Sequence, residues 1–251
     1  MPAPIDAATI VLLRDGDEGP EAFMLRRHAG ASFMAGAWVF PGGKLESFDA
    51  AIPHDLVDDP DAPDLALRVA AARETFEEAG ILLGRLPDGR HPTVDDLIAM
   101  DSEAARDRLN DRDDQWDWSE WLEAHGVVLE IGALGFASWW ITPEAEPKRF
   151  DTRFYLAAVP PEQDARHDDV ETSHSVWTTP AAALAAAQRG EAMVVPPTRK
   201  NLEALLSFPS VDAAIDHARS TPDPEPILPV VERRGDETWV THPSMGELRI
   251  R

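Results

Sequence analysis

Three glutamates stand close together in one short stretch of the chain, at Glu74, Glu77 and Glu78. On an α-helix, their spacings of three and four residues place them on one face, one turn apart. Such like charges repel one another and destabilise a helix unless something positive lies among them. Carboxylate oxygens suit Mg²⁺ or Mn²⁺, which leave coordination positions for water and phosphate oxygens. The sequence therefore predicts a divalent-metal site that neutralises a diphosphate and activates an attacking water.

The stretch that carries these glutamates, residues 65–79, has the pattern of a helix. Apolar residues recur there at intervals of three and four, at Leu65, Val69, Ala72 and Phe76. Asp64 is expected as the N-cap and Gly80 as the residue that ends the helix. The apolar side argues against the alternative of a merely solvated acidic face. Arg73 is placed to hydrogen-bond a neighbouring carboxylate and fix its orientation.

The segments before this helix indicate strands joined by turns. Residues 8–13 and 22–25 are apolar runs on either side of a glycine-bearing acidic turn, which predicts a hairpin. Residues 37–40 form a short strand that Pro41-Gly42-Gly43 ends, and a carbonyl of that bend can reach the same ion. Residues 49–64 hold six aspartates and three prolines with no Lys or Arg, so a solvated loop is expected.

The segments after the helix alternate between both kinds of element. Two polar helical stretches are expected within residues 93–125, as a surface insertion. Strands are expected at 127–140, 150–159 and 170–177, and helices at 180–189, 199–207 and 211–219. A proline-rich link at 221–229 leads to a C-terminal hairpin. This order predicts an α/β domain with a mixed sheet covered on both faces.

The glutamate helix resembles the conserved box of the Nudix hydrolases. That box has a glycine, five residues, Glu, seven residues, and then R-E-U-x-E-E-x-G-U, where U is aliphatic. The end of the box matches Arg73 to Ile81, with Thr75 at the first aliphatic place. Its start matches Gly43, but Asp49 stands where the pattern has Glu, and 23 residues separate Asp49 from Arg73. An insertion inside the box is therefore expected at about residues 50–64, and Asp49 is left out of the site.

The interrupted box is similar to the Nudix branch that includes the peroxisomal coenzyme A diphosphatase. The likeness continues in residues 24–27, 36–43, 140–143 and 149–155. The resemblance implies a Nudix-type α/β/α sandwich with a helical insertion, in one domain over residues 1–251. The helical insertion is expected at about 86–126, and the C-terminal helices and hairpin at about 197–251.

The resemblance also implies roles for single residues. Glu74 and Glu78 are expected to hold Mg²⁺ or Mn²⁺, with the Gly43 carbonyl as a further ligand. Glu77 is a third ligand or the base that takes the proton of water. A base outside the box is also expected in some members, and the candidates here are Glu171, Glu144 and Glu146.

A small anionic substrate needs cations, which this chain has in few places. With 23 Lys and Arg against 46 Asp and Glu, the surface repels nucleic acids and anionic membranes, so neither is an expected partner. Arg26, Arg27 and Arg149 are the candidate contacts for a nucleoside-diphosphate substrate, since arginine binds phosphate in a bidentate manner. The alternative is that each arginine pairs with nearby acids.

Other features of composition limit the remaining functions. The chain has no cysteine, which excludes disulfides, thiolate zinc sites and a cysteine nucleophile. No leader or long apolar run is visible, so a cytoplasmic protein is expected. Tryptophans in the predicted strands are expected in the core. Those in the polar insertion, at Trp116, Trp118 and Trp121, are expected on the surface, where they favour a homodimer contact.

Three functions are compatible with these observations. The first is hydrolysis of coenzyme A or acyl-coenzyme A to 3′,5′-ADP and a phosphopantetheine. The second keeps the chemistry but acts on ADP-ribose, NADH or another dinucleotide. The third is a ligand-sensing Nudix domain without catalysis, which the presence of all three glutamates disfavours.

Overall fold

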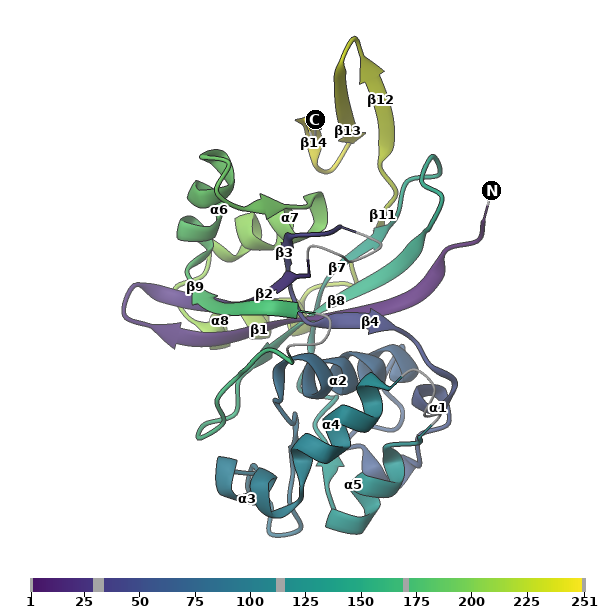
Figure 1. Ribbon diagram of the computed structural model, residues 1–251, viewed down its shortest axis with the longest axis vertical. Coiled ribbons are helices and arrows are strands. Elements are labelled where there is room, and N and C mark those ends of the chain that lie inside the picture. Colours follow the sequence, from purple (N-terminus) through teal and green to yellow (C-terminus); the bar gives the residue numbers. More distant parts are fainter. Residues whose placement is uncertain (1, 29–33, 112–115, 169–171, 250–251) are drawn as a thin grey trace.

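The computed structural model describes residues 2–28, 34–111, 116–168 and 172–249 (Figure 1). The strands are β1 Ile5–Gly16, β2 Gly19–Arg27, β3 Ala37–Val39, β4 Gly42–Lys44, β5 Gly84–Arg85, β6 Val128–Leu129, β7 Gly135–Ile141, β8 Phe150–Ala158, β9 Thr172–Thr178, β10 Met193–Val194, β11 Pro226–Ile227, β12 Val230–Arg234, β13 Glu237–His242 and β14 Gly246–Arg249. The α-helices are α1 Ser47–Ala50, α2 Leu65–Ala79, α3 Val94–Ala99, α4 Ser102–Asn110, α5 Ser119–His125, α6 Pro180–Gln188, α7 Pro196–Leu205 and α8 Val211–Ser220.

A nine-stranded mixed sheet forms the centre of the molecule, in the order β10-β3-β2-β1-β8-β7-β11. β4 pairs with the early residues of β1, and β9 pairs with β2. β1 runs parallel to β8 and antiparallel to β2, and the β1–β2 hairpin closes at Gly16 and Gly19. The predicted hairpin and mixed sheet are confirmed.

The alternation of side chains along β1 divides the core into two layers. Val11 and Leu13 face one side of the sheet, where they pack in a cluster with residues of α6, α7 and α8. Ile10 and Leu12 face the other side, which α2 covers (Figure 1). The helices on both faces are therefore as the sequence predicts.

A third apolar cluster lies on the outer side of α2 and corrects the expectation for the insertion. Phe76 of α2 packs against Trp118 and Trp121, with ring centroids 5.9 and 5.2 Å apart. Trp118 is 1% exposed and Trp121 is 9% exposed, so they are core residues. The expectation that Trp118 and Trp121 lie on the surface is thus wrong, because the insertion packs onto α2 through them (Figure 1). A homodimer stays a prediction.

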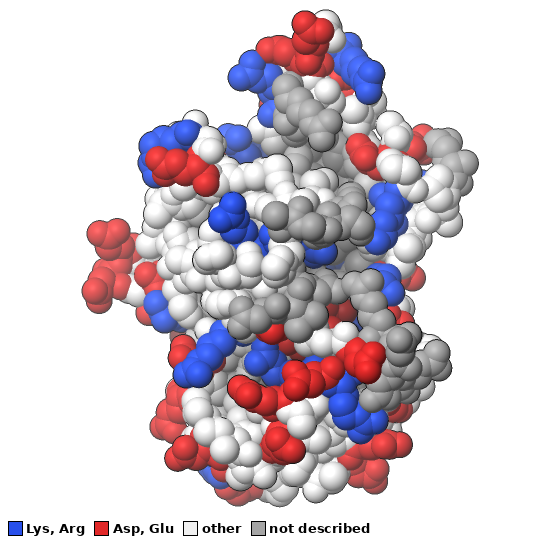
Figure 2. Space-filling view, in the orientation of Figure 1, with Lys and Arg blue, Asp and Glu red and all other residues white. Residues whose placement is uncertain are grey.

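The acidic segment at 49–64 is also more ordered than a solvated loop. It contains the end of α1 and a 3₁₀ turn at His54–Leu56. Ile52, Leu56 and Val57 between the aspartates are buried in the same third cluster. These apolar side chains fix the segment beside α2, while its aspartates after Asp49 are exposed or half-buried. Figure 2 shows acidic side chains over much of the part that holds α2–α5, with Lys and Arg groups among them.

Helix α2 has the predicted bounds, but its first cap differs from the prediction. Asp64 occupies the N-cap position in a left-handed conformation and accepts no side-chain capping hydrogen bond. Gly80 ends the helix with φ of 69°, a conformation that favours glycine. Arg106 of α4 then donates from Nε to the carbonyl of Glu77 at 3.1 Å, which satisfies an acceptor of the last turn.

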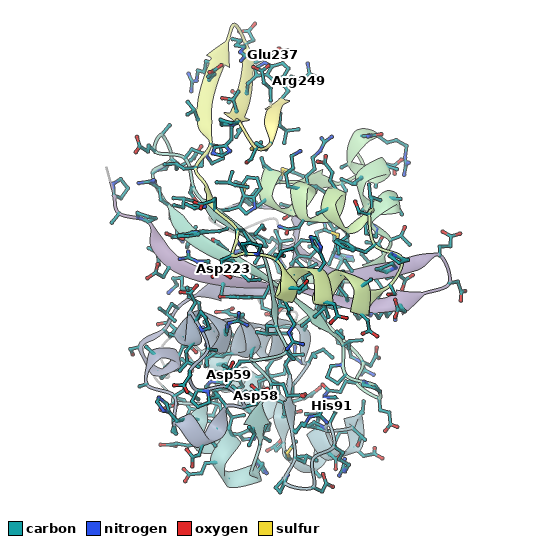
Figure 3. The ribbon with its side chains drawn as sticks, turned by 180° about the vertical axis from the view of Figure 1, so that it is seen from behind. Asp58, Asp59, His91, Asp223, Glu237 and Arg249 are labelled. Carbon is teal, nitrogen blue, oxygen red and sulfur yellow. The ribbon has the colours of Figure 1, made fainter. Side chains whose placement is uncertain are left out.

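The C-terminal part is a three-stranded sheet, β12-β13-β14, where a hairpin was expected. It lies at the opposite end of the molecule from α3–α5 (Figure 1). Arg249 and Glu237 form an ion pair on this sheet, at the same end in the view from behind (Figure 3). The assignment of the whole chain to one domain stays a prediction. Over the described ranges, no helix is long and apolar enough to cross a membrane.

Candidate active site

Strand β4 and helix α2 bring the carboxylates to an edge of the sheet. β4 pairs antiparallel with β1, so that Gly43 lies opposite Ala8. A Cβ atom at Gly43 would lie 2.4–2.6 Å from the carboxylate atoms of Glu74, which is closer than any side chain can approach. The absence of a side chain at Gly43 therefore lets the Glu74 carboxylate lie directly against the strand backbone.

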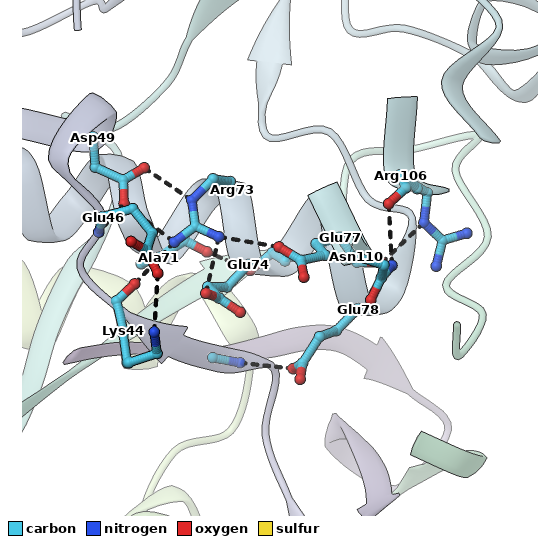
Figure 4. Close-up of polar contacts among 12 residues, drawn as sticks. Lys44, Glu46, Asp49, Ala71, Arg73, Glu74, Glu77, Glu78, Arg106 and Asn110 are labelled. Carbon is cyan, nitrogen blue, oxygen red and sulfur yellow. Dashed lines mark hydrogen bonds and ion pairs between the residues drawn. The ribbon is translucent and has the colours of Figure 1, made fainter. Parts of the chain in front are cut away.

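Arg73 connects the carboxylates of this site. Its Nε donates to Asp49 Oδ1 at 2.9 Å, and its Nη2 donates to Asp49 Oδ2 at 3.1 Å and to the Lys44 carbonyl at 2.9 Å. Its Nη1 lies 2.9 Å from Glu74 Oε1 and 3.0 Å from Glu77 Oε2. These contacts match the five N–H donors of a guanidinium. Figure 4 shows Arg73 between Asp49 on one side and the two glutamates on the other.

Burial and charge act in opposite directions on Arg73. Burial alone would lower the pKa of its guanidinium. The charges of Glu74, Asp49 and Glu77 outweigh burial and raise that pKa above its usual value. The side chain is 3% exposed, so Arg73 is a fixed positive charge inside the protein.

Asp49 corrects the expectation that it lies away from the site. It is completely buried, forms a bidentate pair with Arg73, and accepts a hydrogen bond from the Glu46 N–H at 2.9 Å. Burial raises the pKa of its carboxyl, and Arg73 counteracts part of that rise. The inserted segment folds back through its buried apolar residues, so 23 intervening residues do not separate Asp49 from Arg73.

The three predicted glutamates lie together, but they face different neighbours. Glu74 and Glu77 contact Arg73 and line a cavity, whereas Glu78 is 3% exposed and accepts the Gly42 N–H at 2.9 Å. In the part of the chain that the structure describes, no three acidic, His or Cys side chains converge as they would on a bound ion. The carboxylates nevertheless fit a hard cation. Asp49, Glu74 and Glu77 surround the single guanidinium of Arg73, so net negative charge remains at the cavity wall.

The cavity beside these glutamates has a volume of about 870 Å³. Thr9 of β1 and Thr152 and Phe154 of β8 line it, and by alternation they lie on the sheet face that α6–α8 cover. The cavity thus extends from the glutamates of α2, past the glycines of β4, to the opposite face of the sheet. Side chains of the helical insertion also reach the cavity, at Leu109, Asp111, Trp116 and Asp117.

Of the three arginines predicted to contact the substrate, one lines the cavity and two do not. Arg27 lines the cavity, whereas Arg26 is exposed and lies outside it. Arg149 is buried outside the cavity and donates to the carbonyls of Thr142 and Pro2, both at 3.1 Å. These contacts disfavour Arg149 as a substrate contact and indicate a structural role.

Two lysines that are not among the predicted substrate contacts lie at the cavity, together with one of the three candidate bases. Lys44 and Lys148 both line the cavity, and Glu146 lines it as well. Glu144 is exposed and outside the cavity, which disfavours it as a base. Glu171 lies outside the described residues. The scarcity of lysine is a signal that could have found the first two, because the chain has just three in all.

Comparisons with known proteins give matches over most of the chain. Residues 53–205 match the family model described as the NUDT19 Nudix domain. Acyl-coenzyme A diphosphatase NUDT19 of Gallus gallus is 27% identical over 238 aligned positions, covering 76% of this chain and 62% of that protein. The protein of the same name in Homo sapiens is 27% identical over 234 positions, with coverage of 77% and 62%.

Two further matches bear on the fold and on length. Putative nudix hydrolase 7 of Caenorhabditis elegans is 29% identical, covering 69% of this chain and 52% of that protein. This chain thus spans between half and two thirds of the length of these curated relatives. The crystal structure of a Nudix hydrolase from Alicyclobacillus acidocaldarius is 31% identical with a TM-score of 0.73, covering 88% of this chain and all of that one. The Nudix-type α/β fold is therefore confirmed.

Proposed function

We propose that this chain, which belongs to the NUDT19 Nudix domain family, is a metal-dependent diphosphatase that cleaves coenzyme A or acyl-coenzyme A. Water would attack the diphosphate, giving 3′,5′-ADP and phosphopantetheine or its acyl ester. The observation that carries the proposal is the position of Glu74 and Glu77 on the wall of an 870 Å³ cavity. A cavity of that size suits a ligand of nucleotide size.

Glu74, Glu77 and Glu78 would hold Mg²⁺ or Mn²⁺, together with the Gly43 carbonyl. When bound, such an ion neutralises the diphosphate and lowers the pKa of the attacking water. To bind the ion, Glu74 and Glu77 would give up contacts with Arg73, and Glu78 would give up its contact with the Gly42 N–H. Arg73 would stay fixed through Asp49 and orient the glutamate side chains during that exchange.

The cations of the cavity would hold the phosphate groups of the substrate. Arg27, Lys44 and Lys148 line the cavity in a chain whose net charge is −23. Local positive charge is needed in such a protein, because the overall field repels an anionic substrate. The names of the chicken and human relatives, acyl-coenzyme A diphosphatase, support this choice of substrate.

The test is product analysis with a matched panel of substrates. The purified chain would be incubated with Mg²⁺ or Mn²⁺ and with coenzyme A, octanoyl-coenzyme A, ADP-ribose or NADH, and the products separated by chromatography. We expect 3′,5′-ADP from the two coenzyme A compounds, with kcat/KM at least about tenfold above that for the others. Turnover of ADP-ribose or NADH, with no 3′,5′-ADP released from either coenzyme A compound, would reject the coenzyme A assignment. Binding of a nucleotide without turnover of any would indicate a ligand-sensing domain.

A further inference from the structure

The cavity has a second wall, made by the C-terminal sheet and different in chemistry from the first. Val231 of β12 and Val240 of β13 both line the cavity. They are direct cross-strand partners, so their side chains lie on the same face of the small sheet. Val230, the neighbour of Val231 along β12, points to the other face and is 60% exposed. The small sheet thus presents one apolar pair to the cavity.

The core of the protein holds this valine pair in place. Val240 is 4% exposed and belongs to the cluster that contains Trp140 and Phe154, which also line the cavity. Val231 and Leu248 pack against the same cluster. Because the cluster is shared with the large sheet, the valine pair is a fixed part of the cavity wall.

The two walls suit different parts of one extended ligand. Acidic and basic side chains of α2 and β4 line one part of the cavity, and the C-terminal sheet lies on the opposite side of the large sheet from α2 (Figure 1). A phosphate or ribose placed against valines would lose hydration without gaining hydrogen bonds. A hydrocarbon chain placed there gains from leaving water. The valine wall therefore favours an apolar group at the end of the ligand remote from the diphosphate.

We infer that the C-terminal sheet determines specificity, with Val231 and Val240 contacting the acyl group of an acyl-coenzyme A. This inference rests on the proposed function, because it assumes that the diphosphate of such a substrate lies at the α2 glutamates. It assigns a binding role to Val231 and Val240, which lie beyond the region that matches the family model.

The test compares chain-length preference in matched variants. The substrates are free, butyryl- and octanoyl-coenzyme A, and the readout is kcat/KM for each acyl ester relative to free coenzyme A. Val231→Asn should lower the octanoyl ratio about tenfold and the butyryl ratio less, because each buried methylene contributes a several-fold preference. Val231→Thr, which keeps the shape of valine, should lower the octanoyl ratio about threefold. Val230→Asn is the matched control, and its ratios should equal those of the wild type.

Each result decides the inference. A lower octanoyl ratio in both Val231 variants but not in Val230→Asn supports it, and thermal midpoints report whether the variants fold. If Val231→Asn unfolds, Val231→Thr gives the decision. An unchanged ratio in the Val231 variants, or an equal fall in Val230→Asn, rejects the specificity role while the proposed function stands. Failure of the wild type to cleave any coenzyme A compound rejects both.

Discussion

Two arginine–carboxylate networks in this molecule have similar partners but different surroundings. Arg73 on α2 contacts Asp49, Glu74 and Glu77 inside the protein, with 3% of its side chain exposed. Arg234 on the C-terminal sheet contacts Glu232 and Glu247, both at 2.7 Å, with 41% of its side chain exposed. Short ion-pair distances therefore do not distinguish the two.

The pKa values of the two arginines differ in their causes. Hydrogen bonds that Arg234 donates to Glu247 and Glu232 raise the pKa of its guanidinium, and burial opposes them weakly. For Arg73, burial is the largest influence and would lower the pKa, and the surrounding carboxylates reverse its effect. A charge in the interior depends on its partners, because water cannot replace them, whereas water replaces a lost partner at the surface. We therefore expect substitutions in the first network to have large effects and those in the second to have small ones.

Glu74→Gln should give the largest effect, on catalysis. The substitution keeps the shape of the side chain but removes the charge that we propose for metal binding. We expect kcat/KM to fall by a factor on the order of a thousand, as when a group that activates the attacking water is lost. Glu120→Gln, at an exposed position of α5, is the control and should match the wild type. Full activity of Glu74→Gln in steady-state assays would remove Glu74 from the mechanism.

Arg73→Met should give the largest effect on stability. It leaves Asp49 buried without its positive partner, and removal of one member of a buried pair costs about 3–5 kcal/mol. Urea unfolding of the variant, followed by far-UV circular dichroism, would measure the change. A loss below about 1 kcal/mol, the size found for exposed pairs, would contradict the distinction between the two networks.

Asp49→Asn should have an intermediate effect. An asparagine oxygen still accepts one hydrogen bond from Arg73, while its amide group cannot accept the second. We expect a loss of about 1–3 kcal/mol in the free energy of unfolding, together with lower activity as Arg73 loses its anchor. A variant as stable and active as the wild type would show that Asp49 is dispensable to the site.

Arg234→Met should have the smallest effect. Its partners Glu232 and Glu247 remain hydrated at the surface after the substitution. The urea midpoint should equal that of the wild type within error, both at low salt and at 0.5 M NaCl. A midpoint shift as large as that of Arg73→Met would show that burial does not govern these networks.

The sequence predicts the local features of this site well. Helix α2 has the expected bounds, because its apolar periodicity and Gly80 are properties of neighbouring residues. The hairpin of β1 and β2 is correct for the same reason. The structure also places Gly43 beside Glu74, whereas the role of the Gly43 carbonyl as a metal ligand stays a prediction.

Contacts between distant segments account for what the sequence does not predict. The Asp49–Arg73 pair depends on how the inserted segment folds back, and its one sequence signal is an acid at the sixth position after Gly43. The sequence groups Arg149 with other basic residues, whereas in the structure its guanidinium donates to the backbone carbonyls of Thr142 and Pro2. Trp118 and Trp121 lie in a polar stretch, so their packing on Phe76 is visible in three dimensions alone.

Binding of Mn²⁺ tests the central claim, that the carboxylate face of α2 is a divalent-metal site, without assuming a substrate. Free Mn²⁺ would be measured by electron paramagnetic resonance during titration of the wild type, Glu74→Gln and Glu120→Gln. We predict saturable binding to the wild type and Glu120→Gln, with affinity at least about tenfold weaker in Glu74→Gln. Equal affinity in all three proteins would contradict the account.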